Sequence, residues 1–131
     1  MEQDDISEPF KQGSLLLPGI EVRAMEKPWY SHPAWDGVFL KDLVTANETG
    51  GAFSYHLVRV EPNGEVADHD HETQWEWNVV LAGSGSFLVD GAAVPVAGPG
   101  QTFVTPPRTH HTVSAGDDEL SLLALFVPAL A

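Results

Sequence analysis

Two histidines and a carboxylate lie close together in the stretch DHDHETQWEWNVVLAGSG, residues 68–85. His69 and His71 are one residue apart, and Glu76 follows five positions later. On a β-strand, residues i and i+2 point to the same face, so both imidazoles can turn toward one ion. The chain between His71 and Glu76 is long enough to bend, so the carboxylate can reach the same point from a neighbouring strand. Imidazole and carboxylate together suit iron, manganese, cobalt, nickel, copper or zinc.

A fourth ligand has to come from another part of the chain. The segment PPRTHHTV, residues 106–113, offers two adjacent candidates, His110 and His111. From the residue types alone, either imidazole could complete a nitrogen and oxygen ligand set.

The elements that must position these side chains are short apolar segments separated by turn signals. EPNGE at 61–65 predicts a turn, and Asp90-Gly91 is a strong hairpin signal. No long segment has the 3.6-residue period of a helix. The strand-like segments are 20–24, 38–44, 53–60, 76–83, 85–91, 92–96, 98–107, 110–115 and 119–128. Short strands at intervals of roughly 8–12 residues, with almost no helix, predict an all-β sandwich or small barrel.

The order of residues around the histidine pair resembles the first sequence motif of the cupin superfamily. Gly64 is followed by His69-x-His71, then by Glu76 and finally by Gly83. The interval from Gly64 to His69 is one residue shorter than that motif usually has.

A second segment resembles the other cupin motif, which has a glycine, five residues, a proline, and a histidine five positions after the proline. Here these residues are Gly100, Pro106 and His111, so the resemblance selects His111 as the fourth ligand. Arg108 stands where the family usually has glycine, and Ala115 where it often has asparagine. Neither difference removes a metal ligand.

The resemblance implies an antiparallel jelly-roll barrel that holds one divalent metal through three histidines and one glutamate. Residues 19–131 would then form a single cupin β-barrel domain. Residues 1–18, which are polar and contain two prolines, are expected to form an N-terminal arm.

Four further residues are candidates for weaker reasons. Asn78 should share the face of Glu76, either as a pocket residue with a catalytic role or as a buried hydrogen-bonding group. Arg108 could receive a substrate carboxylate at the mouth of the second motif, or it could be a surface arginine. His56 could line the barrel, but a core or edge histidine is the first expectation, and His32 is expected to lie on a surface loop.

Composition limits the possible partners and compartments. Nineteen acidic residues against six basic ones give a formal net charge of −13, which repels nucleic acid and anionic lipid. The chain has no cysteine, so disulfides, thiolate metal sites and cysteine nucleophiles are excluded. No apolar run approaches the ~20 residues that span a bilayer. We therefore expect a cytoplasmic protein with a small-molecule ligand or substrate.

The ligand set leaves one or two positions open on a six-coordinate metal, which distinguishes a reactive site from a structural one. The metal could activate dioxygen, or it could act as a Lewis acid in an isomerase, lyase or decarboxylase. The sequence shows no independent acid–base pair, which favours dioxygenase chemistry on a small oxygenated or aromatic metabolite. The alternative is a non-catalytic cupin that binds or senses a small molecule. The identity of the metal, among iron, manganese, nickel and zinc, stays open.

Exposed apolar residues predict self-association. The arm contains LLLP at 15–18, and Trp75 and Trp77 lie on one face of a predicted strand. A small barrel cannot cover all of this surface by itself. We therefore expect a homodimer.

Overall fold

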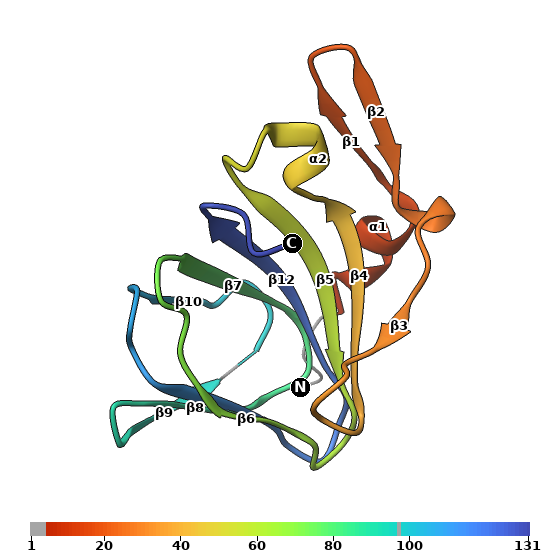
Figure 1. Ribbon diagram of the computed structural model, residues 1–131. Helices are drawn as coiled ribbons and strands as arrows, with labels where there is room; N and C mark the ends of the chain where they lie inside the picture. The colour runs from red at the N-terminus through yellow and green to blue at the C-terminus, as the bar shows by residue number, and fades with distance from the viewer. Residues whose placement is uncertain (1–4, 97) are drawn as a thin grey trace.

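Two antiparallel sheets face each other in the computed structural model, which describes residues 5–96 and 98–131 (Figure 1). The larger sheet has six strands, in the order β10 (Thr102–Thr105), β7 (Trp75–Ala82), β12 (Leu120–Val127), β5 (Ser54–Val60), β4 (Val38–Val44) and β3 (Tyr30–Ser31). The smaller sheet has four, in the order β6 (Glu65–His69), β11 (His111–Ala115), β8 (Gly85–Val89) and β9 (Ala92–Val96). The expected all-β jelly-roll fold is confirmed.

Alternation of side chains along the strands builds two apolar clusters. On β12, Leu122, Ala124 and Phe126 point between the sheets, whereas Leu123 points to the outer face of the larger sheet. The inner cluster joins both sheets through residues such as Val80 and Phe87. This packing fixes the distance between the sheets, and with it the position of every inward polar side chain.

The turn residues adopt the backbone conformations that the sequence predicts. Asp90 and Gly91 have φ values of 47° and 82° and connect β8 directly to β9. Both angles are positive, as a two-residue hairpin with the twist of its strands requires. Asn63, in the turn after β5, also has a positive φ of 59°.

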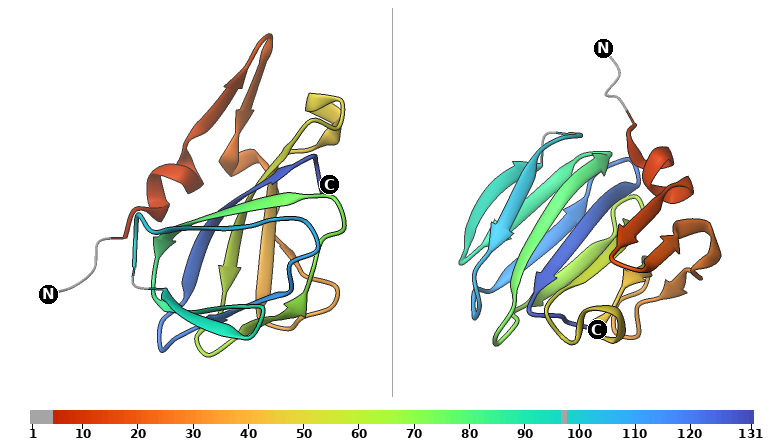
Figure 2. Two further views of the ribbon diagram at one scale, coloured as in Figure 1. Left: turned by 90° about the vertical axis from the view of Figure 1, so that its left-hand side faces the viewer. Right: turned by 90° about the horizontal axis from the view of Figure 1, so that it is seen from above.

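The N-terminal residues, which are expected to form an arm, contain regular secondary structure. Helix α1 (Ser7–Gln12) is followed by a hairpin of β1 (Ser14–Leu17) and β2 (Ile20–Arg23), and then by the short 3₁₀ helix η1 (Ala24–Glu26). Figure 1 shows the hairpin projecting beyond the barrel, and Figure 2 shows α1 on the outside of the larger sheet.

The division after residue 18 falls in the turn of this hairpin. Phe10 and Leu15 pack on the outer apolar cluster, and the N–H of Ile6 donates to the carbonyl of Leu81 on β7. The arm therefore contacts the barrel closely. Residues 1–4 of the expected arm lie outside the described residues, and the domain division itself stays a prediction.

A second short helix, α2 (Ala46–Thr49), connects β4 to β5 and lies beside the last residues of the chain. Thr45 and Glu48 form its capping box. The N–H of Ala46 donates to the carbonyl of Ala131, and the N–H of Leu130 donates to Ser54 Oγ. None of the helices in the described part of the chain is long and apolar enough to cross a membrane.

Candidate metal centre

The two sheets bring His69, His71, Glu76 and His111 together. His69 ends β6 and is paired with His111, which begins the adjacent strand β11. Glu76 is the second residue of β7 in the opposite sheet. One ligand atom from each of the four residues lies within 4.8 Å of the other three. The convergence expected from the sequence is therefore present.

Two details of the expected geometry are wrong. His71 does not share a strand with His69, because β6 ends at His69 and His71 lies in the connection that follows. Glu76 does not come from a neighbouring strand either, because this connection crosses from the smaller sheet to the larger one. The Arg108 N–H donates to the carbonyl of His71 at 2.7 Å and helps to hold the connection.

Three buried atoms at this point have no hydrogen-bond partner among the described residues: His71 Nε2, His111 Nε2 and Glu76 Oε1. The two nitrogens lie 3.0 and 3.3 Å from Glu76 Oε1, but the contacts lack the alignment of hydrogen bonds. Buried polar atoms are nearly always paired in folded proteins. A cation between them would satisfy all three, so these residues fit a metal ion.

The other ring nitrogens are held by the backbone. His69 Nδ1 donates to the carbonyl of Ala67 at 2.8 Å, and His111 Nδ1 donates to the carbonyl of Thr109 at 2.9 Å. A carbonyl can only accept a hydrogen bond, so each Nδ1 carries a proton, and in the neutral imidazole each Nε2 then has a free lone pair. This is the usual arrangement of metal-binding histidines.

The charges of the cluster also suit a cation. Burial alone would raise the pKa of Glu76, but the adjacent His111 and His71 and the amide of Asn78 outweigh it and hold that pKa well below its ordinary value. Asn78 Nδ2 donates to Glu76 Oε2 at 2.6 Å. Burial also acts to lower the pKa of His111, but Glu76 outweighs it and raises that pKa. Glu76 is thus kept in the ionised form that a metal binds.

A cavity of about 150 Å³ lies against the cluster between the two sheets. Its wall is mainly apolar. The residues that line it are Tyr30, His32, Trp35, Val38, Leu40, Asp42, His56, Val58, Val66, His69, His71, Glu76, Asn78, His111, Val113, Leu122, Ala124, Phe126, Leu130 and Ala131.

Tyr30, Asp42 and His56 form a polar group in this cavity that was not predicted from the sequence. His56 is buried as expected, but it also lines the cavity. The sequence could have indicated Asp42 and His56. Asp42 is an even number of residues from the buried Val38 on β4, and His56 from Val58 on β5, so each side chain points to the same inner face as the valine. A polar residue at an inward position of a strand is a candidate for a site.

His32 is not a plain surface residue. It is half-buried, lines the cavity and stacks on Trp35 with ring centroids 4.2 Å apart. The Trp35 ring lies 5.0 Å from that of His69. The connection between β3 and β4 therefore forms a wall beside the candidate ligands, which its loop-like sequence did not indicate.

Comparison with known proteins agrees with this geometry. The sequence model of the family described as the Cupin domain matches residues 56–128. The chain belongs to the cupin family. Both candidate metal-ligand segments lie within the matched residues. No match was found among the curated proteins.

Solved cupin-like structures share the fold. A Thermotoga maritima protein described as a predicted oxalate decarboxylase has a TM-score of 0.71 at 25% identity, covering 82% of this chain and 97% of that one. KdgF from Halomonas sp. has a TM-score of 0.70 at 20% identity, covering 82% and 91%. An RmlC-like cupin from Shewanella frigidimarina has a TM-score of 0.68 at 18% identity, covering 81% and 87%.

Asn78 and Arg108, the two residues predicted to act in catalysis, have different positions in this cupin. Asn78 is buried, lines the cavity and holds Glu76. Arg108 is exposed and is not among the described residues that line the cavity. Its φ of 59° is a left-handed conformation that glycine adopts without strain. A catalytic role for either residue stays a prediction.

Proposed function

We propose that His69, His71, Glu76 and His111 bind one divalent transition metal, and that the protein is a metal-dependent enzyme for a small oxygenated metabolite. The observation that carries this proposal is the convergence of three buried, unpaired polar atoms on one point. The adjoining cavity supports a small-molecule substrate. Iron, manganese, nickel and zinc are the candidate ions, because imidazole and carboxylate ligands suit all four.

The bound metal would supply either dioxygen activation or Lewis-acid polarisation of a substrate oxygen. The chain's own residues prepare the site for this. Asn78 fixes one oxygen of Glu76, so the other oxygen points toward the histidines. Phe126 lies beside His71, with ring centroids 5.2 Å apart, and forms an apolar wall that limits the access of water.

Dioxygenase-type chemistry is our first candidate. The lack of an acid–base pair in the sequence favours it, but the carboxylate of Asp42 and the hydroxyl of Tyr30 also line the cavity. This observation favours a second candidate, a non-redox isomerase, lyase or decarboxylase. The Thermotoga maritima structure described as a predicted oxalate decarboxylase supports the same candidate.

Metal content tests the first part of the proposal. Protein purified without chelators and without an imidazole column should contain about one divalent ion per chain by elemental analysis. Alanine at any of the four ligands should remove most of it. His110→Ala is the matched control, because His110 is adjacent to His111 in sequence but exposed, with its ring paired to Asp68. Full metal content in all four ligand variants would refute the assignment.

Oxygen consumption separates the two chemistries. Iron-loaded protein is incubated with small phenols, diketones and hydroxy acids, and both oxygen and substrate are followed. A dioxygenase should consume oxygen together with a substrate. A lyase or isomerase should convert a substrate equally well without oxygen. Tight binding of a compound with no turnover under either condition would instead support a non-catalytic binding protein.

A further inference from the structure

One row of residues crosses the larger sheet from the metal cluster to the opposite wall of the cavity. Asn78 on β7 is paired with Ala124 on β12, Ala124 with His56 on β5, and His56 with Asp42 on β4. All four line the cavity. Ala124 has the smallest side chain of the row, so the space between the polar residues stays open.

This row of paired residues sets the length of the cavity between Asn78 and Asp42. Three strand intervals separate the backbones of Asn78 and Asp42, on the order of 14 Å at about 4.8 Å per interval. Glu76, two residues before Asn78, belongs to the metal cluster. A molecule that contacts both the cluster and Asp42 must therefore be extended and several atoms long.

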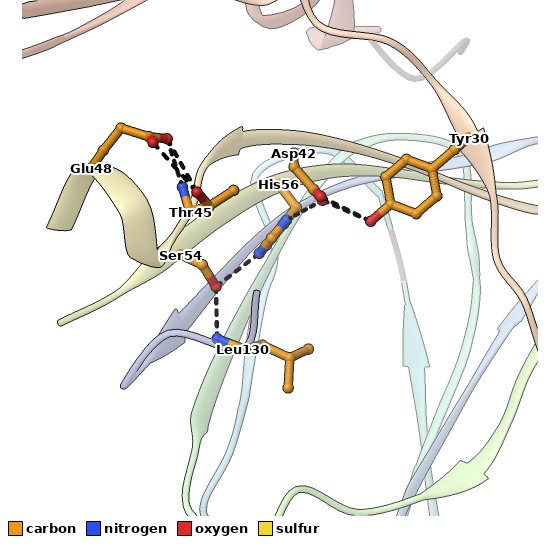
Figure 3. Close-up of polar contacts among 7 residues, drawn as sticks. All are labelled: Tyr30, Asp42, Thr45, Glu48, Ser54, His56 and Leu130. Atoms are coloured by element: carbon orange, nitrogen blue, oxygen red, sulfur yellow. Dashed lines mark hydrogen bonds and ion pairs between the residues drawn. The ribbon is translucent and has the colours of Figure 1, made fainter. Parts of the chain in front are cut away.

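Hydrogen bonds hold Asp42 in place (Figure 3). Tyr30 Oη donates to Asp42 Oδ1 and Oδ2 at 2.8 and 3.0 Å, and His56 Nδ1 donates to Oδ1 at 2.8 Å. Ser54 Oγ lies 2.8 Å from His56 Nε2 and accepts from the N–H of Leu130 at 2.9 Å. The Ser54 hydroxyl proton is therefore free to bond His56 Nε2, which leaves Nδ1 as the donor to Asp42.

Asp42 keeps the capacity to accept another hydrogen bond. Its two oxygens offer about four lone-pair positions, and Tyr30 and His56 supply only two protons. Its side chain is 28% exposed, whereas that of His56 is 5% exposed and has both nitrogens engaged. Asp42, and not His56, is thus the residue that a molecule in the cavity can contact. The hydrogen bond from His56, more than the one from Tyr30, lowers the pKa of Asp42 against the effect of burial.

The charges of the cavity restrict what Asp42 can bind. No lysine or arginine occurs among the described residues that line it. A substrate carboxylate or phosphate near Asp42 would meet a like charge with no compensating cation. A hydroxyl or ammonium group would instead find an ionised acceptor with a vacant lone pair.

We propose that Asp42 is a second substrate-binding residue, and that the substrate carries metal-binding oxygens at one end and a hydroxyl or ammonium donor at the other. The metal-binding end rests on the proposed function. His56 and Tyr30 are positioning residues that orient the Asp42 carboxylate. This assignment excludes dicarboxylates that fill the cavity from end to end.

The test compares two series of probes that differ only at the far end. Aldonic acids of four to six carbons carry a terminal hydroxymethyl group, and the aldaric acids of the same length carry a terminal carboxylate instead. Calorimetry measures the binding of both series to the manganese-loaded parent, Asp42→Asn and Asp118→Asn. Asp118 is an exposed acid in the loop between β11 and β12, so its variant controls for the change in net charge.

At least one aldonate should bind the parent about tenfold or more tightly than its matched aldarate, as expected for one charge-assisted hydrogen bond. Asp42→Asn should abolish most of this preference, and Asp118→Asn should keep it. Equal binding of the two series by the parent would overturn the proposal, and so would failure of every aldonate to bind. Both of these outcomes are measured on the parent protein, so they do not depend on whether a variant folds. Failure to take up any of the four candidate ions, manganese, iron, nickel and zinc, would instead contradict the proposed function.

Discussion

At the scale of single residues, Asp42 illustrates how an inward polar side chain depends on the folded state. Its partners Tyr30 and His56 come from strands on either side of β4, so the hydrogen bonds form only when the sheet forms. Burial and then the contact with Asp42 raise the pKa of Tyr30 to about 12, so its hydroxyl stays protonated and remains a donor. Asp42 therefore accepts from a neutral phenol and from the imidazole of His56.

Acid titration of stability should detect these bonds. Because folding lowers the pKa of Asp42, its contribution is present above the ordinary value of 3.8 and is lost as pH falls through the lower, folded value. We expect the free energy of unfolding of the parent to exceed that of Asp42→Asn near neutral pH, and this difference to shrink between about pH 5 and pH 2. Urea denaturation at several pH values measures it. A difference that is independent of pH would contradict the expectation.

At the scale of elements, the turns decide how closely strands approach. Gly83, between β7 and β8, has a φ of 87°, and a Cβ there would collide with the carbonyl oxygen of Glu119. Gly91 has a similar φ of 82°, but a Cβ there would meet no atom within 4 Å. Substitutions at the two glycines therefore distinguish the cost of backbone strain from the cost of a steric collision.

Gly83→Ala should therefore destabilise the protein more than Gly91→Ala. Both variants bear the cost of an alanine at positive φ, about 1 kcal/mol or more. Only Gly83→Ala adds a backbone collision, for which we expect roughly 1–3 kcal/mol in addition. Chemical denaturation of the two variants side by side measures the difference. Equal losses in the free energy of unfolding would contradict this expectation, because they would mean that the backbone near Glu119 moves away from the new Cβ without cost.

At the turn that contains Arg108, a substitution to glycine should increase stability rather than decrease it. Its φ of 59° suits glycine, so Arg108→Gly should raise the free energy of unfolding by about 0.5–1 kcal/mol. Arg108→Ala loses the same guanidinium but keeps the strained conformation, so it should bring no such gain. Metal content should stay unchanged in both. If the side chain also orients a substrate, both variants should lose ligand affinity to the same degree.

At the scale of the whole molecule, apolar side chains remain exposed on two surfaces. Leu16 on the projecting hairpin is 79% exposed and Met25 in η1 is 72% exposed. Trp75 on β7 is 44% exposed, with its ring centroid 6.2 Å from that of Trp77. Large exposed apolar groups of this kind are typical of protein contacts.

We expect a homodimer that uses one of these surfaces. Sedimentation at micromolar concentration should give twice the chain mass of 14.2 kDa. Leu16→Asp and Trp75→Asp place a charge on each surface separately, and the variant that dissociates identifies the contact. A parent protein that sediments at 14.2 kDa would contradict the prediction.

The sequence by itself determined most of the strands, the turns and the identity of the cluster. Three strands, β1, β3 and β6, lie outside the predicted strand segments. Strand segments follow local alternation, and Asp90-Gly91 encodes its hairpin through backbone conformations that depend on two residues only. His69, His71 and Glu76 lie within one short stretch, and the resemblance to cupins added His111. Such features are local or follow a motif, so they are visible without the fold.

Only the tertiary structure decided where the chain crosses between the sheets and what lines the cavity. Glu76 faces the histidines because β7 belongs to the opposite sheet, a pairing that strand alternation does not specify. Tyr30, Asp42 and His56 become one group because β3, β4 and β5 are adjacent and in a particular register. Strand register depends on contacts between residues far apart in the chain, and the packing energy that fixes it is a property of the whole core.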